Sequence, residues 1–238
     1  MSGSVVPDPV FPAHRLDVTD LACRRAGRPV FAGLSLSLGP GRPVWLKGPN
    51  GVGKSSLLRL LAGLGRPAAG TIALDGVALD DDPEGYAAEV HFIGHAEALK
   101  PALSLYDNTA FFARLQGVAE AQVAERVDAA LDTLSLGALR DLPARMLSSG
   151  QRRRAALARL FLAARPIWLL DEPTVGLDAG ARADLARLIA RHAGQGGCAL
   201  IASHDPLDPA MAVVEMASAA SLDLGPDGDA DLDMWEIA

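Results

Sequence analysis

The chain alternates short apolar runs with amphipathic stretches, a pattern typical of an α/β protein. Residues 16–22 and 30–38 have the composition of strands and flank a Gly-Arg-Pro turn, so they predict a hairpin. Residues 70–74 and the Asp-Gly turn after them predict a second hairpin. Further strands are expected at 44–47, 90–93, 167–170 and 199–203. Because the run at 167–170 is fully apolar, it indicates a sheet buried on both faces.

Between about residues 103 and 164 the pattern becomes helical and rich in Ala and Leu. Apolar residues recur there at i, i+4, i+7, i+8 and i+11, on one face of a helix. They are Val123, Val127, Ala130, Leu131 and Leu134. We therefore expect a helical subdomain over about 103–164, inserted into the α/β body. Helices are also expected at 56–62 and 181–191, a polar break at 80–83, and a last edge strand at 221–224.

The length of 238 residues, half of them hydrophobic, suits one domain with a substantial core. We expect a flexible leader over 1–13, a single domain over 14–225 and an acidic tail over 226–238. The net charge of −7 arises at the C-terminal end, where residues 205–236 carry nine acids and no Lys or Arg. The remainder holds 20 acids against 22 bases. Such a near-neutral body lacks the basic surface of a nucleic-acid-binding protein, so no nucleic-acid partner is expected.

Targeting and redox signals are absent from the sequence pattern. No run of about 18 uncharged apolar residues predicts a transmembrane helix. The first residues lack the basic start and apolar stretch of a secretory signal. Cys23 and Cys198 match no metal or redox motif, so we interpret them as ordinary thiols, with Cys198 packed in a strand.

The segment 48–55 reads Gly-Pro-Asn-Gly-Val-Gly-Lys-Ser, a complete phosphate-binding loop between a predicted strand and a predicted helix. Its glycines permit backbone conformations that side chains would block, so successive N–H groups can hold phosphate oxygens at a helix N-terminus. Lys54 adds a positive charge for the outer phosphates, and the Ser55 hydroxyl is offered to Mg²⁺. The predicted ATP-binding residues are Gly48, Pro49, Asn50, Gly51, Val52, Gly53, Lys54, Ser55 and Ser56.

Two adjacent carboxylates, Asp171 and Glu172, follow the apolar strand 167–170 and precede a proline. Ligands of open α/β sheets bind at this carboxyl edge of the strands. Asp171 is therefore predicted to hold Mg²⁺ together with Ser55. Glu172 is predicted to act as the general base that polarises the attacking water.

A second helix N-terminus is predicted just before the basic run 152–154. It consists of Leu147, Ser148, Ser149, Gly150 and Gln151. Its free N–H groups and serine hydroxyls suit a phosphate, but it lies in a different subdomain from the phosphate loop. This placement favours an interaction with the γ-phosphate bound by a partner subunit.

These motifs, followed by Val175–Asp178 and Ser203-His204, occur in the order found in ATP-binding-cassette (ABC) ATPases, and the resemblance covers residues 16–204. It implies a P-loop NTPase fold of the ABC type, with an antiparallel β subdomain and the inserted helical subdomain. It also implies a head-to-tail homodimer that encloses two ATP molecules. Asp178 would then lie in the loop that crosses the dimer interface, and His204 would contact the γ-phosphate and keep Glu172 and the water aligned.

A narrower resemblance rests on His95, which stands where most cassettes have a glutamine, and on Lys100 five residues later. This Gly-His pair resembles the ATP-binding subunits of the heme exporter of cytochrome c maturation, as do residues 21–25, 57–64 and 150–160. The resemblance implies a catalytic role for His95, integral membrane subunits as partners, and a peripheral location on the cytoplasmic face of the inner membrane.

The sequence departs from the cassette pattern in one respect, because no aromatic residue near 23–28 is available to stack on adenine. Arg24 or Arg25 could stack a guanidinium plane on the base instead. We therefore expect weak discrimination between ATP and GTP.

Two alternatives remain open at this point. The chain could be the ATPase of another ABC exporter, for a lipid, drug or peptide. It could also be a soluble ABC scaffold ATPase, such as one in iron–sulfur assembly.

Overall fold

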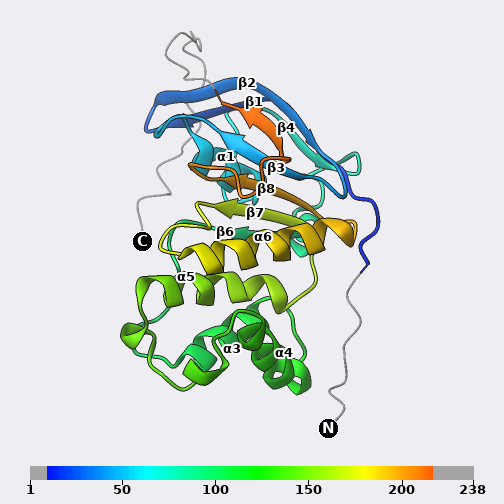
Figure 1. Cartoon of the computed structure of the whole chain (residues 1–238). Helices are drawn as coiled ribbons and strands as arrows, with labels where there is room; N and C mark the ends of the chain where they lie inside the picture. The colour runs from blue at the N-terminus through cyan, green and yellow to red at the C-terminus, as the bar shows by residue number, and fades with distance from the viewer. Residues whose placement is uncertain (1–9, 217–238) are drawn as a thin grey trace.

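Two β-sheets and a group of helices are stacked in layers in the computed structural model, which describes residues 10–216 (Figure 1). The antiparallel sheet has the order β2-β1-β4-β5. Its strands are β1 (Leu16–Arg25), β2 (Arg28–Leu38), β4 (Ala69–Leu74) and β5 (Val77–Ala78). The predicted edge strand at 221–224 and the acidic tail lie outside the described residues, as does most of the predicted leader.

The first hairpin turns earlier than expected. Arg25 pairs with Arg28, so the turn consists of Ala26 and Gly27 rather than Gly-Arg-Pro. Both turn residues have positive φ, 46° and 71°. A two-residue hairpin turn of this twist needs positive φ at both positions, and proline cannot supply it. The turn geometry, rather than the proline, therefore decides where β1 ends.

The second sheet is parallel, with the order β6-β7-β8-β3-β9. Its strands are β3 (Pro43–Lys47), β6 (Val90–Ile93), β7 (Ile167–Asp171), β8 (Cys198–Ala202) and β9 (Ala212–Glu215). Every residue of β7 and β8 is buried, which confirms that the centre of this sheet is covered on both faces. The edge strand β9 was not predicted, because its residues alternate between half-buried and exposed and none of them is fully buried.

The helices are α1 (Lys54–Leu61), α2 (Pro83–Glu89), α3 (Leu105–Leu115), α4 (Glu120–Thr133), α5 (Ser149–Ala158) and α6 (Ala179–Gly194), with 3₁₀ turns η1 (Gly137–Leu139), η2 (Ala144–Met146) and η3 (Arg159–Phe161). The five apolar residues of the predicted α4 face are all buried, as expected. The stretch around 80–83 is not only a break. Asp82 accepts a hydrogen bond from the Gly85 N–H at 2.9 Å, and Pro83 opens α2. No helix of residues 10–216 has the length and apolar character needed to cross a bilayer.

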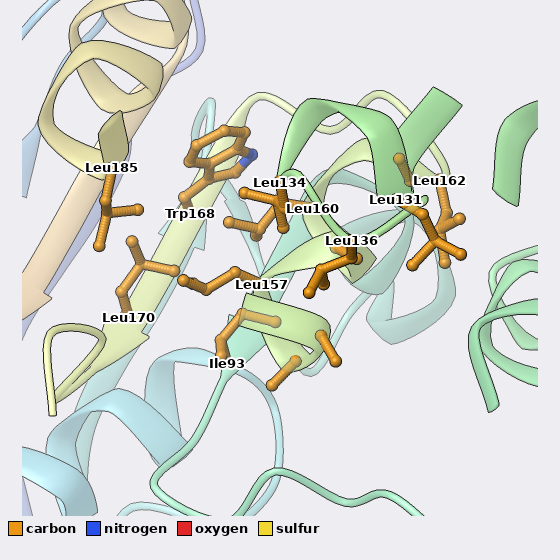
Figure 2. Packing of buried hydrophobic residues seen from close by; sticks show 14 of the residues in the cluster. Ile93, Leu131, Leu134, Leu136, Leu157, Leu160, Leu162, Trp168, Leu170 and Leu185 are labelled. Atoms are coloured by element: carbon orange, nitrogen blue, oxygen red, sulfur yellow. The ribbon is translucent and has the colours of Figure 1, made fainter. Parts of the chain in front are cut away.

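Two hydrophobic cores lie on opposite faces of the parallel sheet. One packs the sheet against α1 and the antiparallel sheet, and the other packs it against α3, α4, α5 and α6. The strand β7 contributes to both, with Ile167 and Leu169 in the first and Trp168 and Leu170 in the second. Figure 2 shows the second core, where Leu157 of α5 lies close to Leu170. This shared strand fixes the helices relative to the sheet edge that carries the site.

Candidate functional site

The predicted phosphate loop connects the end of β3 to the start of α1. At Gly53 φ is 109°, and a Cβ there would stand 2.6 Å from the Val30 side chain, so only glycine fits. Lys54 is 8% exposed, and its ammonium donates to the carbonyl oxygens of Gly48 at 2.7 Å and Pro49 at 3.1 Å. The phosphate loop thus surrounds the Lys54 ammonium. To bind a phosphate, this ammonium would have to give up its hydrogen bonds to the two carbonyl oxygens.

The two predicted carboxylates lie at the carboxyl end of β7, beside the loop. The Ser55 hydroxyl donates to Asp171 Oδ1 at 3.1 Å. Glu172 has φ of 48°, a left-handed backbone that is costly for a residue with a side chain, and its N–H donates to the Ala202 carbonyl at 2.8 Å. Among the described residues, its buried Oε2 has no hydrogen-bond partner. A strained backbone and an unpartnered carboxylate oxygen are both features of functional sites.

A cavity of about 490 Å³ joins these groups. Most of the predicted ATP-binding and catalytic residues line it, namely Asn50, Gly51, Gly53, Lys54, Ser55, Ser56, His95, Asp171, Glu172 and His204. Gly48, Pro49 and Val52 do not line it. The first two hold Lys54, and Val52 is buried in the core. His95 and His204 are exposed, so both are open to solvent at the rim of the cavity.

The predicted second helix end is the N-terminus of α5, and it does not line this cavity. The Ser148 hydroxyl accepts from the Gln151 N–H at 3.2 Å, while Gln151 Oε1 accepts from the Ser148 N–H at 2.8 Å. This capping box leaves the N–H groups of Ser149 and Gly150 without an acceptor inside the helix. A Cβ on Gly150 would stand 2.7 Å from the Gly176 carbonyl oxygen. Leu147 is buried in the helical core.

Asp178 also lies away from the cavity. It caps α6, accepting from the Ala181 N–H at 2.8 Å. Within one chain its carboxylate therefore has a structural partner. The loop that precedes it passes over Gly150 at Gly176.

Sequence reasoning missed Arg153, which is 3% exposed and reaches from α5 to the site. Its guanidinium donates to carbonyl oxygens of five residues on two segments. The distances are 2.5 Å to Asp171, 2.8 Å to Glu172, 2.9 Å to Gly94, 3.3 Å to His95 and 3.4 Å to Pro173. Burial lowers the pKa of Arg153, while Asp171, Glu97 and Glu172 act in the opposite direction.

The spacing of the sequence gives no signal for Arg153, because each arginine of the run 152–154 stands three and four residues before apolar residues. The structure buries only Arg153 of the three, on the face of α5 that meets the sheet edge. A basic residue on such a face must find acceptors inside the protein. Arg153 finds them at the backbone of the two segments that carry His95, Asp171 and Glu172.

The structure also separates the two arginines considered for the nucleotide base. The Arg24 guanidinium donates to the Gly27 carbonyl at 2.9 Å, whereas Arg25 lines the cavity beside Val30. Arg25 is therefore the one placed to meet a ligand in this cavity.

The glycine loop, the paired carboxylates at the edge of a parallel sheet, the antiparallel sheet and the inserted helices together define an ABC-type nucleotide-binding domain. The family model described as "ABC transporter" matches residues 31–175. A solved structure described as an ATP-binding subunit of an ABC transporter has a TM-score of 0.72 and 28% identity, covering 79% of each chain. These findings confirm the fold class expected from the sequence.

The chain is 50% identical over 188 residues to the cytochrome c biogenesis ATP-binding export protein CcmA of Rhodospirillum rubrum, with 79% of each chain covered. It is 46% identical over 218 residues to the CcmA protein of Ruegeria pomeroyi, covering 90% of this chain and 98% of that one. The chain belongs to the ABC transporter family and, within it, to the CcmA proteins. It is thus an ATP-binding subunit with ATPase activity, and the resemblance to the cytochrome c maturation ATPases is confirmed.

Proposed function

We propose that this protein hydrolyses ATP to drive an export complex that handles heme during the maturation of c-type cytochromes. One observation carries the proposal. A single cavity gathers the phosphate loop, both carboxylates, His95 and His204, in a chain that matches CcmA proteins over most of their length. The name of those relatives supports cytochrome c biogenesis as the process.

The loop would bind the triphosphate through its N–H groups and the Lys54 ammonium. In this step Lys54 exchanges the Gly48 and Pro49 carbonyls for phosphate oxygens. The oxygen pair of Ser55 and Asp171, 3.1 Å apart, fits the preference of Mg²⁺ for hard oxygen ligands. When bound, the metal would supply positive charge against the phosphates.

Glu172 is proposed as the general base. Its unpartnered Oε2 can accept a proton from a water molecule, and its backbone is held by the Ala202 carbonyl on one side and by Arg153 on the other. His204 lines the same cavity and is proposed to contact the γ-phosphate and align this water.

A second copy of the chain would complete each site. The N-terminus of α5 presents free N–H groups but lies away from the cavity of its own chain, so its anion site is available to the nucleotide of a partner. In the proposed head-to-tail homodimer, Ser149, Gly150 and Gln151 face the partner's ATP, and Asp178 lies in the loop at the interface. ATP would close this dimer because it binds the closed pair better than the open one.

The membrane step requires other chains. We propose that integral membrane subunits bind this protein on the cytoplasmic face of the inner membrane, near residues 95–105. His95 begins this segment and also lines the cavity, and Arg153 donates to the carbonyl oxygens of both His95 and Glu172. A backbone movement at His95 would then be transmitted to Glu172, and a movement at Glu172 to His95.

The Glu172→Gln variant tests the enzymatic part. It should bind ATP and form a stable dimer by light scattering, while phosphate release falls at least about 100-fold, since a general base contributes roughly 10²–10⁴. Glu84→Gln, on the exposed start of α2, is the matched control and should behave as wild type. A monomer at saturating magnesium nucleotide, or undiminished turnover, would contradict the proposal.

The cytochrome part is tested by deleting the gene and staining cell proteins for covalent heme. We expect the stain of c-type cytochromes to disappear and to return with the wild-type gene but not with the Glu172→Gln gene. Full staining in the deletion strain would favour the export of another cargo.

A further inference from the structure

A second cavity, of about 280 Å³, lies at the other edge of the parallel sheet. Its lining includes Arg165 and Trp168 at the start of β7 and Gln195 just before β8, whereas the nucleotide cavity lies where these strands end. Residues of α4 and α6, Phe11, and residues of the segment 160–164 from η3 onward form the remaining sides. None of its lining residues also lines the nucleotide cavity. It is slightly smaller than the roughly 300–1,000 Å³ of typical ligand sites, which limits an occupant to a small molecule.

Aromatic rings make up much of the wall. Trp168 and His192 are stacked, with ring centroids 3.8 Å apart and planes 11° from parallel. Phe161 meets Trp168 edge-on at 5.9 Å, and Phe11 meets His192 in the same way at 5.1 Å. The Phe11 N–H donates to the Gln195 carbonyl at 2.8 Å, which holds the backbone of Phe11 beside the cavity. Such a wall favours a flat, apolar ligand body.

The charges at the cavity have one sign. Arg126, Arg165 and Arg191 line it, and none of its lining residues is an Asp or Glu, although the whole chain has a net charge of −7. Arg165 is occupied by the carbonyls of Ala87 and Val90 at 2.7 and 2.8 Å. Arg126 is half-buried, and within residues 10–216 its guanidinium has no ion-pair or hydrogen-bond partner. A concave site with this charge attracts an anion.

One wall residue also lacks a partner. Trp168 is 4% exposed, and its buried indole N–H donates to no acceptor among the described residues. In Figure 2 the indole nitrogen lies on the ring edge that faces Leu134 and the helical subdomain, away from Leu185 of α6. An unsatisfied buried donor is destabilising. This nitrogen is closed to solvent, so it is out of reach of a molecule in the cavity, and Trp168 contributes its ring to the wall.

We propose that this cavity binds a small aromatic carboxylate. Its ring would lie against the wall formed by Phe161, Trp168 and His192, and its carboxylate would accept a hydrogen bond from Arg126. The apolar wall and the cationic side of the cavity each match one part of such a molecule. Because α4 and α6 both line the cavity, the ligand would connect the helical subdomain to the α/β body.

Calorimetric titration of the full chain without nucleotide tests the proposal, with 2-naphthoate as the probe and 2-naphthalenemethanol as its uncharged analogue. Naphthoate should bind with a Kd below about 1 mM, and the alcohol about tenfold more weakly, since a charge-assisted hydrogen bond is lost. Arg126→Gln should weaken naphthoate binding about tenfold and leave the alcohol unaffected. Arg145→Gln, an exposed arginine away from the cavity, should change neither affinity.

Equal affinities for the acid and the alcohol would overturn the proposal. So would an Arg126→Gln protein that binds naphthoate as wild type does, or the lack of saturable binding below about 1 mM.

Discussion

Arg153 makes the most demanding prediction about the stability of this fold. Its guanidinium is buried and bonded only to backbone carbonyls, so no side-chain rearrangement can replace it. In Arg153→Met, a side chain of similar length fills the space but donates nothing. The carbonyls of Asp171, Glu172 and Gly94, each within 3.0 Å of the guanidinium, then lose a donor in a buried place.

The expected loss follows from those three short bonds. A hydrogen bond to a charged group contributes roughly 1.5–3 kcal/mol net, which would sum to more than about 4.5 kcal/mol if the bonds were independent. The desolvation cost of the buried guanidinium offsets part of this sum. We therefore expect Arg153→Met to lower the free energy of unfolding by about 3–4 kcal/mol, a large share of the roughly 5–15 kcal/mol typical of a domain.

Urea denaturation followed by circular dichroism measures this difference, with Arg154→Met as the matched control. Arg154 is the next residue of α5 and makes one 3.3 Å hydrogen bond, to the Leu134 carbonyl, so its loss should cost less than about 1 kcal/mol. Arg153→Lys keeps the charge without the planar fork and should fall between the two. If Arg153→Met and Arg154→Met proved equally stable, the reasoning from the carbonyl contacts would be refuted.

Three further predictions concern a glycine, a histidine and an arginine. Gly150→Ala should destabilise the chain by about 1–3 kcal/mol in urea denaturation, because its Cβ would stand 2.7 Å from the Gly176 carbonyl oxygen; wild-type stability would contradict this. Burial lowers the pKa of His192 from 6.5 to about 4, so the unfolded chain binds the proton first and stability falls as pH drops from about 6.5 to about 4. Between pH 7 and pH 5 this residue should account for about 2 kcal/mol, and His192→Phe should flatten the pH dependence by that amount. Arg25→Ala should weaken ATP and GTP binding alike by about 1 kcal/mol in a fluorescence titration, whereas a loss for one nucleotide alone would count against stacking on the base.

The fold class and most strands could be predicted from the sequence because apolar periodicity and turn residues report burial directly. β9 and α2 could not. β9 is a half-buried edge strand, and α2 is a short helix whose only buried residue is Tyr86. The first turn was predicted at the wrong residues because a proline can be seen in the sequence, whereas the positive φ of Ala26 cannot.

The residues proposed for the site were chosen from motif spacing, and the structure places ten of them around one cavity. Spacing could not reveal which backbone groups a buried side chain would meet, so Arg153 was missed. Spacing also does not tell whether the α5 N-terminus serves its own chain or another. That question depends on distances between elements far apart in sequence, which here keep this helix end outside the cavity.

The strand β7 directs alternate side chains into two cores, with Trp168 on one face and Leu169 on the other. The helices between 105 and 158 consequently pack in one hydrophobic core with the sheet. They do not form a hydrophobic core of their own. Excised from the chain, they would expose the surface that Trp168 and Leu170 now cover. A chimaera with helices from one relative and a sheet from another would have to match shapes along this single strand, so successful grafts should carry β7 with them.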